Sequence, residues 1–268
     1  MRWRNKYEAN FAVLMSTALV LSLAACGQSA KTPEEIYDEA ILKSQSLDAL
    51  DGDMEMAMTM DMGGMSLGMK MGADIQLKKI SDSEAELAMV MSTNILGEEV
   101  IVEEYFKDGY LYMNDGSGFK LKAPFDYSEV AGQATLNTAT SRDFMDKLEM
   151  TEDKDGNYVF NYTIAPDKMN EYLDNALDGM DELMGEDGSF TIGEMGGTCV
   201  IDKDYNVLSD KVHMVMDMSV EGQTVSMSVD VSLVYNAVGD AVTVEFPADL
   251  DSYTEVDHDL MAGALAAA

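Results

Sequence analysis

The sequence predicts an α+β fold in which one antiparallel β-sheet carries helices on its apolar face. Most of the chain consists of segments in which apolar and polar residues alternate, and turn sequences at hairpin spacing separate them. Two segments, near residues 32–47 and 166–184, instead have apolar residues at helical spacing. Strands joined by short turns pair antiparallel, and the helices must then cover the apolar face of the sheet. The 268 residues show no shift in composition that marks a second domain, so we expect one domain over residues 32–253.

Residues 1–25 have the features of a lipoprotein signal peptide. Basic residues precede an apolar run over residues 11–23, which is too short to span a membrane. The run ends in Leu23-Ala24-Ala25-Cys26, which resembles the lipobox of bacterial lipoproteins. The resemblance implies that Cys26 is lipidated, that residues 26–31 are a tether, and that the protein is anchored at the extracytoplasmic face of the cell membrane. The alternative is an ordinary cleaved signal peptide with a chance cysteine.

A helix is predicted to begin at Thr32-Pro33-Glu34-Glu35. Thr32 can cap this helix, proline suits its first position, and Glu35 completes a capping box. The helix should end near Leu47, and Asp51-Gly52-Asp53 should turn the chain into the first strand.

The predicted site depends on the segment Met54–Met62, in which a methionine occupies every second position. In a strand, these five methionines share one face, and Glu55, Ala57, Thr59 and Asp61 share the other. Burying one methionine contributes roughly 1.5–3 kcal/mol. Leaving all five in water would forfeit about 10 kcal/mol, which is comparable to the stability of a whole domain. We therefore expect this face to be covered, either by the protein's own core or by an apolar ligand.

The remaining elements follow from alternation and turn signals. Five further strands up to Pro124 should form a meander with the methionine strand, and Asp108-Gly109 is the clearest of its hairpin turns. The later predictions begin with a short helix at residues 139–148, a hairpin across Asp155-Gly156 and a helix that starts at Pro166. Asp187-Gly188 and Gly196-Gly197 should bracket a loop or a short strand. Strands at residues 198–201, 207–220, 224–235 and 242–246 and a flexible tail at residues 254–268 should follow.

Several of these features together resemble the DUF6612 lipoproteins of Gram-positive bacteria. They are the lipobox, the capped first helix, the methionine-alternating strands, and the hairpins at residues 107–113 and 220–225. More distantly, the chain looks like the LolA/LppX-type lipoprotein carriers. That resemblance implies one large curved antiparallel sheet, a half-barrel, around a few helices. It also implies an apolar cavity that binds a lipid or another hydrophobic molecule.

The predicted ligand-binding wall combines methionines of several strands with the helix after Pro166. Methionine is flexible and has a soft sulfur, so it suits irregular packing and promiscuous apolar binding. Two alternatives stay open. One is a plainly packed core, as in a structural or interaction module of the cell envelope. The other is a copper(I) site made of thioethers, but His213 would point away from its neighbouring methionines and could not join them as a ligand. The predicted wall residues are Met54, Met56, Met58, Met60, Met62, Met69, Met71, Met89, Met91, Met214, Met216, Met218, Met227, Tyr172, Leu173 and Leu177.

Charge and motifs exclude several classes of function. The net charge of −33 opposes binding to nucleic acid and docking on anionic lipid by charge alone. No nucleophile elbow or histidine-centred motif is present, and Cys199 lies in a strand-like segment, so we expect no enzymatic activity. The acidic runs at residues 153–157 and 202–204 lack the ligand ladder of a calcium loop, and hairpin turns explain them better. No cofactor is expected, and the identity of any ligand and the oligomeric state stay open.

Overall fold

The computed structural model describes residues 31–62, 64–81, 83–95, 98–127, 140–165, 168, 189–220 and 223–265. Residues Lys31–Ala268 form one compact unit, separate from residues Met1–Ala30. The strands are β1 (Ala49–Met62), β2 (Met65–Ser81), β3 (Glu84–Ile95), β4 (Glu98–Lys107), β5 (Tyr110–Asn114), β6 (Lys120–Pro124), β7 (Met145–Glu152), β8 (Tyr158–Ile164), β9 (Ser189–Ile201), β10 (Val207–Val220), β11 (Gln223–Val238) and β12 (Thr254–Glu255). The described helices are α1 (Pro33–Gln45) and α5 (His258–Leu265), with single 3₁₀ turns η1 (Arg142–Phe144), η3 (Gly239–Ala241) and η4 (Leu250–Ser252).

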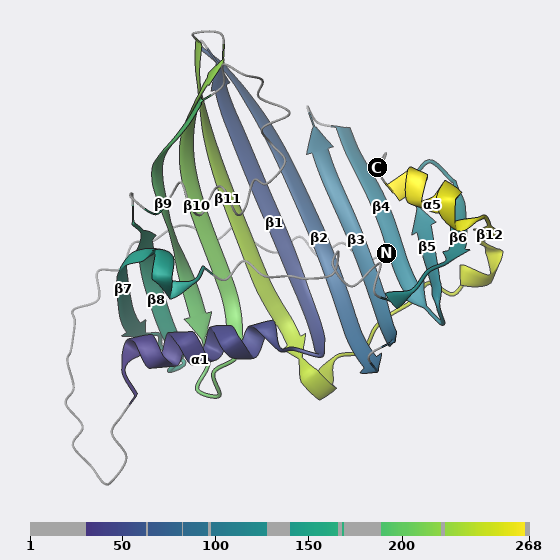
Figure 1. Ribbon diagram of the computed structural model, residues 1–268, viewed down its shortest axis with the longest axis horizontal. Coiled ribbons are helices and arrows are strands. Elements are labelled where there is room, and N and C mark those ends of the chain that lie inside the picture. Colours follow the sequence, from purple (N-terminus) through teal and green to yellow (C-terminus); the bar gives the residue numbers. More distant parts are fainter. Residues whose placement is uncertain are drawn as a thin grey trace. The chain divides into compact units, whose positions relative to one another are not determined.

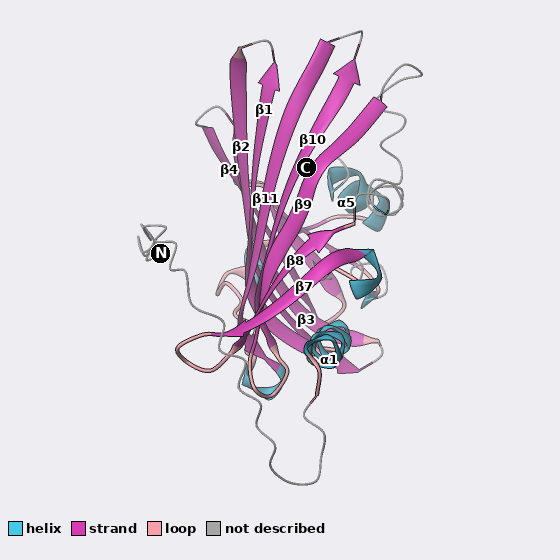
Figure 2. Cartoon of the chain, turned by 90° about the vertical axis from the view of Figure 1, so that its left-hand side faces the viewer, coloured by secondary structure: helices cyan, strands magenta, loops and turns pink. Residues whose placement is uncertain are grey.

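Within these ranges, twelve strands form one open sheet (Figure 1). Its order is β12-β6-β5-β4-β3-β2-β1-β11-β10-β9-β8-β7, so β1 lies near the middle, between β2 and β11. All pairs are antiparallel except β12 with β6, which is parallel. In the perpendicular view, β7 crosses the direction of β1 and β2 obliquely, which is the twist expected of a sheet of this width (Figure 2). The prediction of one large sheet with few helices is confirmed, and the purely antiparallel pairing is corrected at β12.

The meander of β1 to β6 is confirmed, and so is the first helix. The turn predicted at Asp51-Gly52-Asp53 is wrong, because these residues already pair within β1, which begins at Ala49. The Thr32 hydroxyl oxygen accepts a hydrogen bond from the Glu35 backbone N–H at 3.3 Å, and the Glu35 carboxylate accepts one from the Thr32 backbone N–H at 2.8 Å. This is the predicted capping box. The buried side of α1, with Tyr37 and Ala40 at its centre, packs on Phe160 and neighbouring residues of β8 and β9.

Both described helices lie on the same face of the sheet. Side chains alternate between the two faces, and residues paired in register share a face. The register puts Phe160, against which α1 packs, on the same face as Met54 of β1. Leu111 of β5, which packs with Met261 of α5, is also on this face. We call it the helix-bearing face and the other the opposite face; in Figure 2 both helices lie on one side of the strands.

The C-terminal segment corrects two predictions. Residues 242–246 form no strand, although they alternate; instead Val244 and Phe246 pack on Tyr105 and Ala88 of the opposite face. Residues 254–265, expected as part of a flexible tail, pair with β6 through β12 and return over the helix-bearing face as α5. Met261 of α5 is fully buried there. The chain therefore wraps around the β6 edge of the sheet.

Two further predictions are wrong near the other edge. Residues 139–148 were expected to be helical, but the structure has only the short turn η1 and then β7, which pairs with β8 across the predicted Asp155-Gly156 turn. The segment before Gly196-Gly197, predicted to be a loop or a short strand, is strand from Ser189 onward, but Gly196-Gly197 lies inside β9 and does not end that strand as predicted. A Cβ at Gly197 would come within 2.4 Å of the Tyr162 hydroxyl oxygen, so glycine at this position lets the Tyr162 ring lie across the strand. Most of the helix predicted to start at Pro166 lies outside the described residues.

Candidate functional site

The register brings the predicted methionines together on the helix-bearing face. Met58 of β1 lies opposite Met69 of β2 and Val229 of β11, and Val229 in turn pairs with Met214 of β10. The same alternation holds along each of these strands and along β3. Thus the thirteen methionines predicted from sequence all occupy one face, as expected. The prediction that Met54–Met62 forms a strand is confirmed.

Burial of these methionines is graded. Met89, Met216 and Met227 are buried, whereas Met62 is 37% exposed and Met71 is 42% exposed. The side chain of Met218 is not among those described. The other seven, Met54, Met56, Met58, Met60, Met69, Met91 and Met214, are half-buried. The face predicted to be fully covered is therefore only partly covered at its centre.

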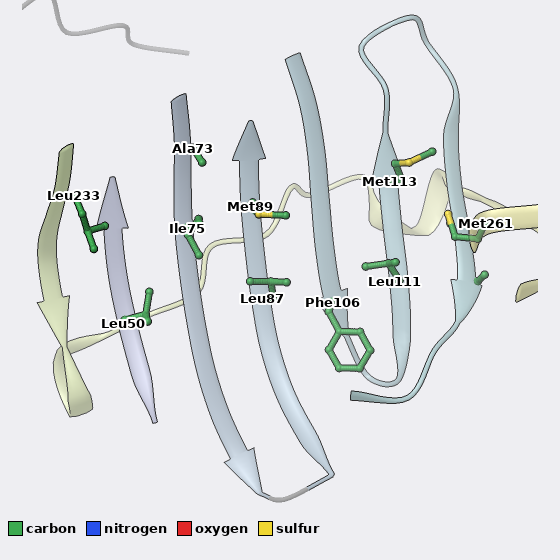
Figure 3. Packing of buried hydrophobic residues seen from close by; sticks show 11 residues of the cluster. Leu50, Ala73, Ile75, Leu87, Met89, Phe106, Leu111, Met113, Leu233 and Met261 are labelled. Carbon is green, nitrogen blue, oxygen red and sulfur yellow. The ribbon is translucent and has the colours of Figure 1, made fainter. Parts of the chain in front are cut away.

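Nine of the thirteen predicted methionines belong to two apolar clusters, and one of the nine, Met214, also packs against the cluster that α1 covers. One cluster lies beneath and beside α5, where Met89 and half-buried Met54 and Met91 join Leu111 and Met261. Figure 3 shows this layer, with side chains of adjacent strands pointing to the same side. We call the other the methionine cluster; it spans β1, β11 and β10, and contains Met56, Met58, Met60, Met214, Met216, Met227, Val229 and Val231. The cluster does not include any residue of α1 or α5.

An exposed apolar patch continues the methionine cluster toward the β1–β2 turn. Met65 is 68% exposed and Leu67 is 39% exposed, and they pair in register with Met62 and Met60. Val100 of β4, 55% exposed, lies on the same face. Exposed apolar surface concentrated on one face marks a ligand or partner site more often than scattered single residues do.

A cleft of about 360 Å³ lies elsewhere, at the ends of β1 and β2 beside η3 and the end of α1. Lys43, Lys78 and Lys79 line it together with Asp48 and Asp240. It includes none of the predicted methionines. The predicted apolar cavity between sheet and helices is therefore not this cleft.

A buried polar network lies under α1, and the sequence analysis missed it. The Tyr162 hydroxyl donates to the Asp210 carboxylate at 3.2 Å and accepts from the Thr140 hydroxyl at 3.4 Å. The Tyr37 hydroxyl donates to the Thr140 carbonyl oxygen at 3.0 Å. Burial, followed by the negative charge of Asp210, raises the pKa of the Tyr162 phenol, so the phenol stays a hydrogen-bond donor. The sequence could have predicted that the Asp210 side chain is buried, because Asp210 alternates in phase with Val212 and Met214 along β10 and therefore lies on the same face.

Glu104 is the second missed residue. It lies on β4 in the same phase as Val102 and Phe106, and so points to the helix-bearing face. Only 4% of its surface is exposed, and its Oε2 has no hydrogen-bond partner in the part of the chain that the structure describes. Burial raises the pKa of this carboxyl group.

The structure also places His213 and Cys199, the residues that the sequence analysis weighed for metal binding and for nucleophilic attack. His213 lies on the opposite face and contacts Asp230 at 2.7 Å, as the copper(I) argument expected of a regular strand. Among the described residues, no three His, Cys, Asp or Glu side chains are grouped so that they could hold a metal ion. Cys199 is buried, and burial raises the pKa of its thiol, which disfavours the nucleophilic thiolate.

The two acidic runs form matching hairpin turns. Asp153 Oδ1 accepts from the backbone N–H groups of Asp155 and Asn157, at 2.8 and 2.9 Å. Asp202 Oδ1 accepts in the same way from Asp204 and Asn206, at 2.8 Å each. Carboxylates engaged with their own turns are structural, as predicted.

The remaining predicted residues are not placed. Cys26, Tyr172, Leu173 and Leu177 lie outside the described residues, so their predicted roles stay predictions. Of the chain that the structure describes, no helix is both long enough and apolar enough to span a membrane.

Comparisons with solved structures find similarity in fold at low sequence identity. LprF from Mycobacterium bovis is 11% identical, over 81% of this chain and 97% of that one, with a TM-score of 0.41. A DUF1329 family protein from Desulfovibrio piger is 12% identical, over 75% and 92% of the two chains, with a TM-score of 0.25. The YwiB protein from Bacillus subtilis is 8% identical, over 73% and 99%, with a TM-score of 0.19. At these values the similarities carry no argument about function.

Among curated proteins, none matches this sequence. The model of a family of unknown function, DUF6612, matches residues 32–252, which is most of the chain and nearly the whole sheet. This confirms the family resemblance drawn from the capped helix, the methionine strands and the hairpins. The chain belongs to the DUF6612 family.

Proposed function

We propose that this protein is a membrane-anchored extracytoplasmic lipoprotein that binds a hydrophobic ligand on the methionine-rich centre of its helix-bearing face. The observation that carries the proposal is a gap in the cover that the described helices give this face. α1 packs at the β8–β9 end and α5 at the β5–β6 end, while the methionine cluster between them includes neither helix.

The residues in this gap suit an exchangeable ligand. Met56, Met58 and Met60 are half-buried, and the patch beyond them is more exposed. Each methionine has three rotatable bonds, so the surface can adapt to guests of different shape. The apolar area left in water is the driving force for binding, because removing it from water contributes roughly 25 cal/mol per Å².

A fluorescent apolar dye tests binding directly. The chain from Gly27 onward, which contains the whole compact unit, is titrated with N-phenyl-1-naphthylamine. We expect saturable fluorescence enhancement that long-chain lipids reverse by competition. Native mass spectrometry of protein purified from cells should also show a co-purified hydrophobic molecule. A clean polypeptide mass together with no dye binding would contradict the proposal.

A matched pair of variants localises the site. Met58→Gln places an amide in the methionine cluster, and Thr59→Gln places the same group on the opposite face, where Thr59 is exposed. We expect M58Q to weaken dye binding about tenfold, since an unpaired amide in an apolar contact costs roughly 1–3 kcal/mol. T59Q should bind like the unmodified chain. Equal effects of the two variants would place the site elsewhere, and unfolding midpoints check that both variants are folded.

Anchoring is tested by fractionation. We expect the unmodified protein in the membrane fraction, because a diacylglyceryl group on Cys26 supplies the two chains that durable anchoring needs. The Cys26→Ser variant should lose the lipid and leave the membrane. Retention of C26S in membranes would refute anchoring through this residue.

A second function, an interaction module of the envelope, is favoured by the exposure of Met65 and Leu67 near the β1–β2 turn. A protein partner would cover this end of the face in place of a lipid. Met65→Ser distinguishes the two functions. It should abolish partner capture in an interaction module, but change dye affinity by less than M58Q does if the face binds small hydrophobic ligands.

A further inference from the structure

Glu104 is a carboxyl group in an apolar layer. Its register partners on the helix-bearing face are Met89 of β3 and Met113 of β5, and its neighbours along β4 on that face are Val102 and Phe106. Met89, Met113 and Phe106 belong to the apolar cluster that α5 covers with Met261. Every near neighbour that the strand pairing gives Glu104 is therefore apolar.

One oxygen of this carboxyl group lacks, among the described residues, the partner that normally accompanies burial. Its side chain is 4% exposed, and its Oε2 makes no hydrogen bond within the described residues. Burial raises the pKa of this carboxyl group. Buried carboxylates in proteins are normally paired or hydrogen-bonded, since an isolated one is costly. A methionine or leucine at this position would pack at lower cost, so Glu104 calls for an explanation outside the folding of the sheet.

Glu104 is connected to the open part of the same face. From Glu104 toward the start of β4, the next two side chains on this face are those of Val102 and Val100, and Val100 is 55% exposed. Four residues of strand span about 13 Å. Beside them on β3, Met91 lies opposite Val102. An apolar row thus leads from the buried carboxyl group to the exposed edge of the patch.

The chemistry that complements this arrangement is an alkyl chain with a cationic end. An ammonium group would pair with the Glu104 carboxylate and supply the missing hydrogen bonds. The net charge of −33 attracts cations to the protein and repels anions. A carboxylate or phosphate at the end of the chain would be repelled both by the surface and by Glu104 itself.

We propose that Glu104 is the polar anchor of the ligand site and that the ligand is a cationic amphiphile. Its ammonium group pairs with Glu104, and its alkyl chain follows the Val102–Met91 row toward the methionine-rich centre of the face. This inference rests on the proposed function, because it assigns the headgroup chemistry of a hydrophobic ligand bound to the same face.

The test compares three probes that share a dodecyl chain: dodecylammonium, dodecanol and dodecanoate. Each displaces N-phenyl-1-naphthylamine from the chain that starts at Gly27, at concentrations below micelle formation. We expect dodecylammonium to displace the dye at least tenfold more effectively than dodecanol, and dodecanoate to be the weakest. In Glu104→Gln, the preference for dodecylammonium over dodecanol should fall to about one.

Glu103→Gln is the matched control. Glu103 is adjacent in sequence but lies on the opposite face, where Asn114 donates a hydrogen bond to its carboxylate at 2.8 Å. E103Q removes the same unit of charge from the protein, so it corrects for the long-range field. We expect E103Q to keep the tenfold preference. A preference that persists in E104Q, or is lost equally in E103Q, would assign it to the acidic surface and overturn the role of Glu104.

A pH series adds a readout that a structural role for Glu104 would not produce. Dodecylammonium needs an ionised partner, so its affinity for the unmodified chain should fall several-fold from pH 8 to pH 5. E104Q should show no such fall. If dodecanol binds as tightly as dodecylammonium, the headgroup inference fails and the proposed function survives. If the dye does not bind at all, both fail.

Discussion

Replacing Met261 with alanine tests whether the C-terminal helix is part of the folded unit. Met261 is fully buried, and it packs from α5 onto Leu111 and Met113 of β5. The short helix depends on this contact, because eight isolated residues are too few to be a stable helix in water. Met261→Ala therefore removes the main anchor of the segment that wraps around the β6 edge.

The expected loss follows from the depth of burial. Methionine-to-alanine changes in well-packed cores cost about 2–5 kcal/mol. If the whole unit unfolds as one, M261A should lose an amount in this range. If α5 undocks by itself, the global loss will be smaller, and the amide protons of residues 258–265 will exchange near the rate of an unfolded chain.

Leu260→Ala is the matched control, because Leu260 lies next to Met261 on the same helix and is 56% exposed. Its replacement should change the free energy of unfolding by about 0.5 kcal/mol or less. The assay is urea unfolding followed by circular dichroism, with hydrogen exchange of the C-terminal amides. Equal losses in the two variants, or unchanged protection of α5 in M261A, would refute the docking of this helix.

Three further predictions concern the buried polar groups. Glu104→Gln should stabilise the protein at pH 8 but not at pH 4. Because the pKa of Glu104 is raised in the folded state, ionising this group costs no folding free energy below about pH 4.5 but destabilises the folded protein as the pH rises, by about 1.4 kcal/mol per unit of pKa shift. A difference in unfolding free energy between the two proteins that does not change with pH would contradict this. Tyr162→Phe should lower the free energy of unfolding by about 1–3 kcal/mol, because Asp210 loses a buried hydrogen bond. The control Tyr158→Phe, at a half-buried position, should lower it by about 0.5 kcal/mol or less in the same urea titration. Cys199 should react with a disulfide reagent only after unfolding, since its thiol is buried and its pKa is raised; rapid reaction of the native protein would show that β9 opens locally.

The sheet was predictable because its signals are local. Period-two alternation and turn pairs such as Asp108-Gly109 determine strands and hairpins without reference to the rest of the chain. The capping box at Thr32 is equally local. For the same reason the methionines could be assigned to one face before their neighbours were known.

The errors arose where distant contacts decide the conformation. Residues 242–246 alternate like a strand, but β1 and β11 already have neighbours on both edges, so this segment packs across the opposite face instead. Residues 145–148 belong to a segment whose apolar spacing fits a short helix, but they pair with β8 and form the first half of β7. The helix α5 was missed because the alanine-rich end of the chain resembles a frayed tail, whereas the buried contact of Met261 and the stacking of His258 on Phe125 hold the helix in place.

The same reasoning explains which part of the candidate site could be read from the sequence. Alternation assigns a side chain to a face, but it does not say which part of that face the helices cover. Glu104 and Asp210 alternate in phase with apolar residues of their strands, so the sequence pattern alone marks them as charged residues on the otherwise apolar helix-bearing face. Their environments differ for a reason that parity cannot reveal. Asp210 receives a hydrogen bond from Tyr162, whereas Glu104 lies among apolar side chains with an unpaired oxygen.

The two faces of β1 differ in charge and in polarity. On the opposite face, Asp53 pairs in register with Asp74, and burial together with the charges of Asp53 and Asp51 raises the pKa of Asp74. Crowded like charges oppose the stacking of a second protein layer there. The helix-bearing face of the same strand carries only Met, Leu and Gly from residue 50 to residue 62. Covering the methionine side would stabilise such a strand further, and we propose that a hydrophobic ligand supplies this cover at the centre, where neither of the described helices packs on the methionine cluster.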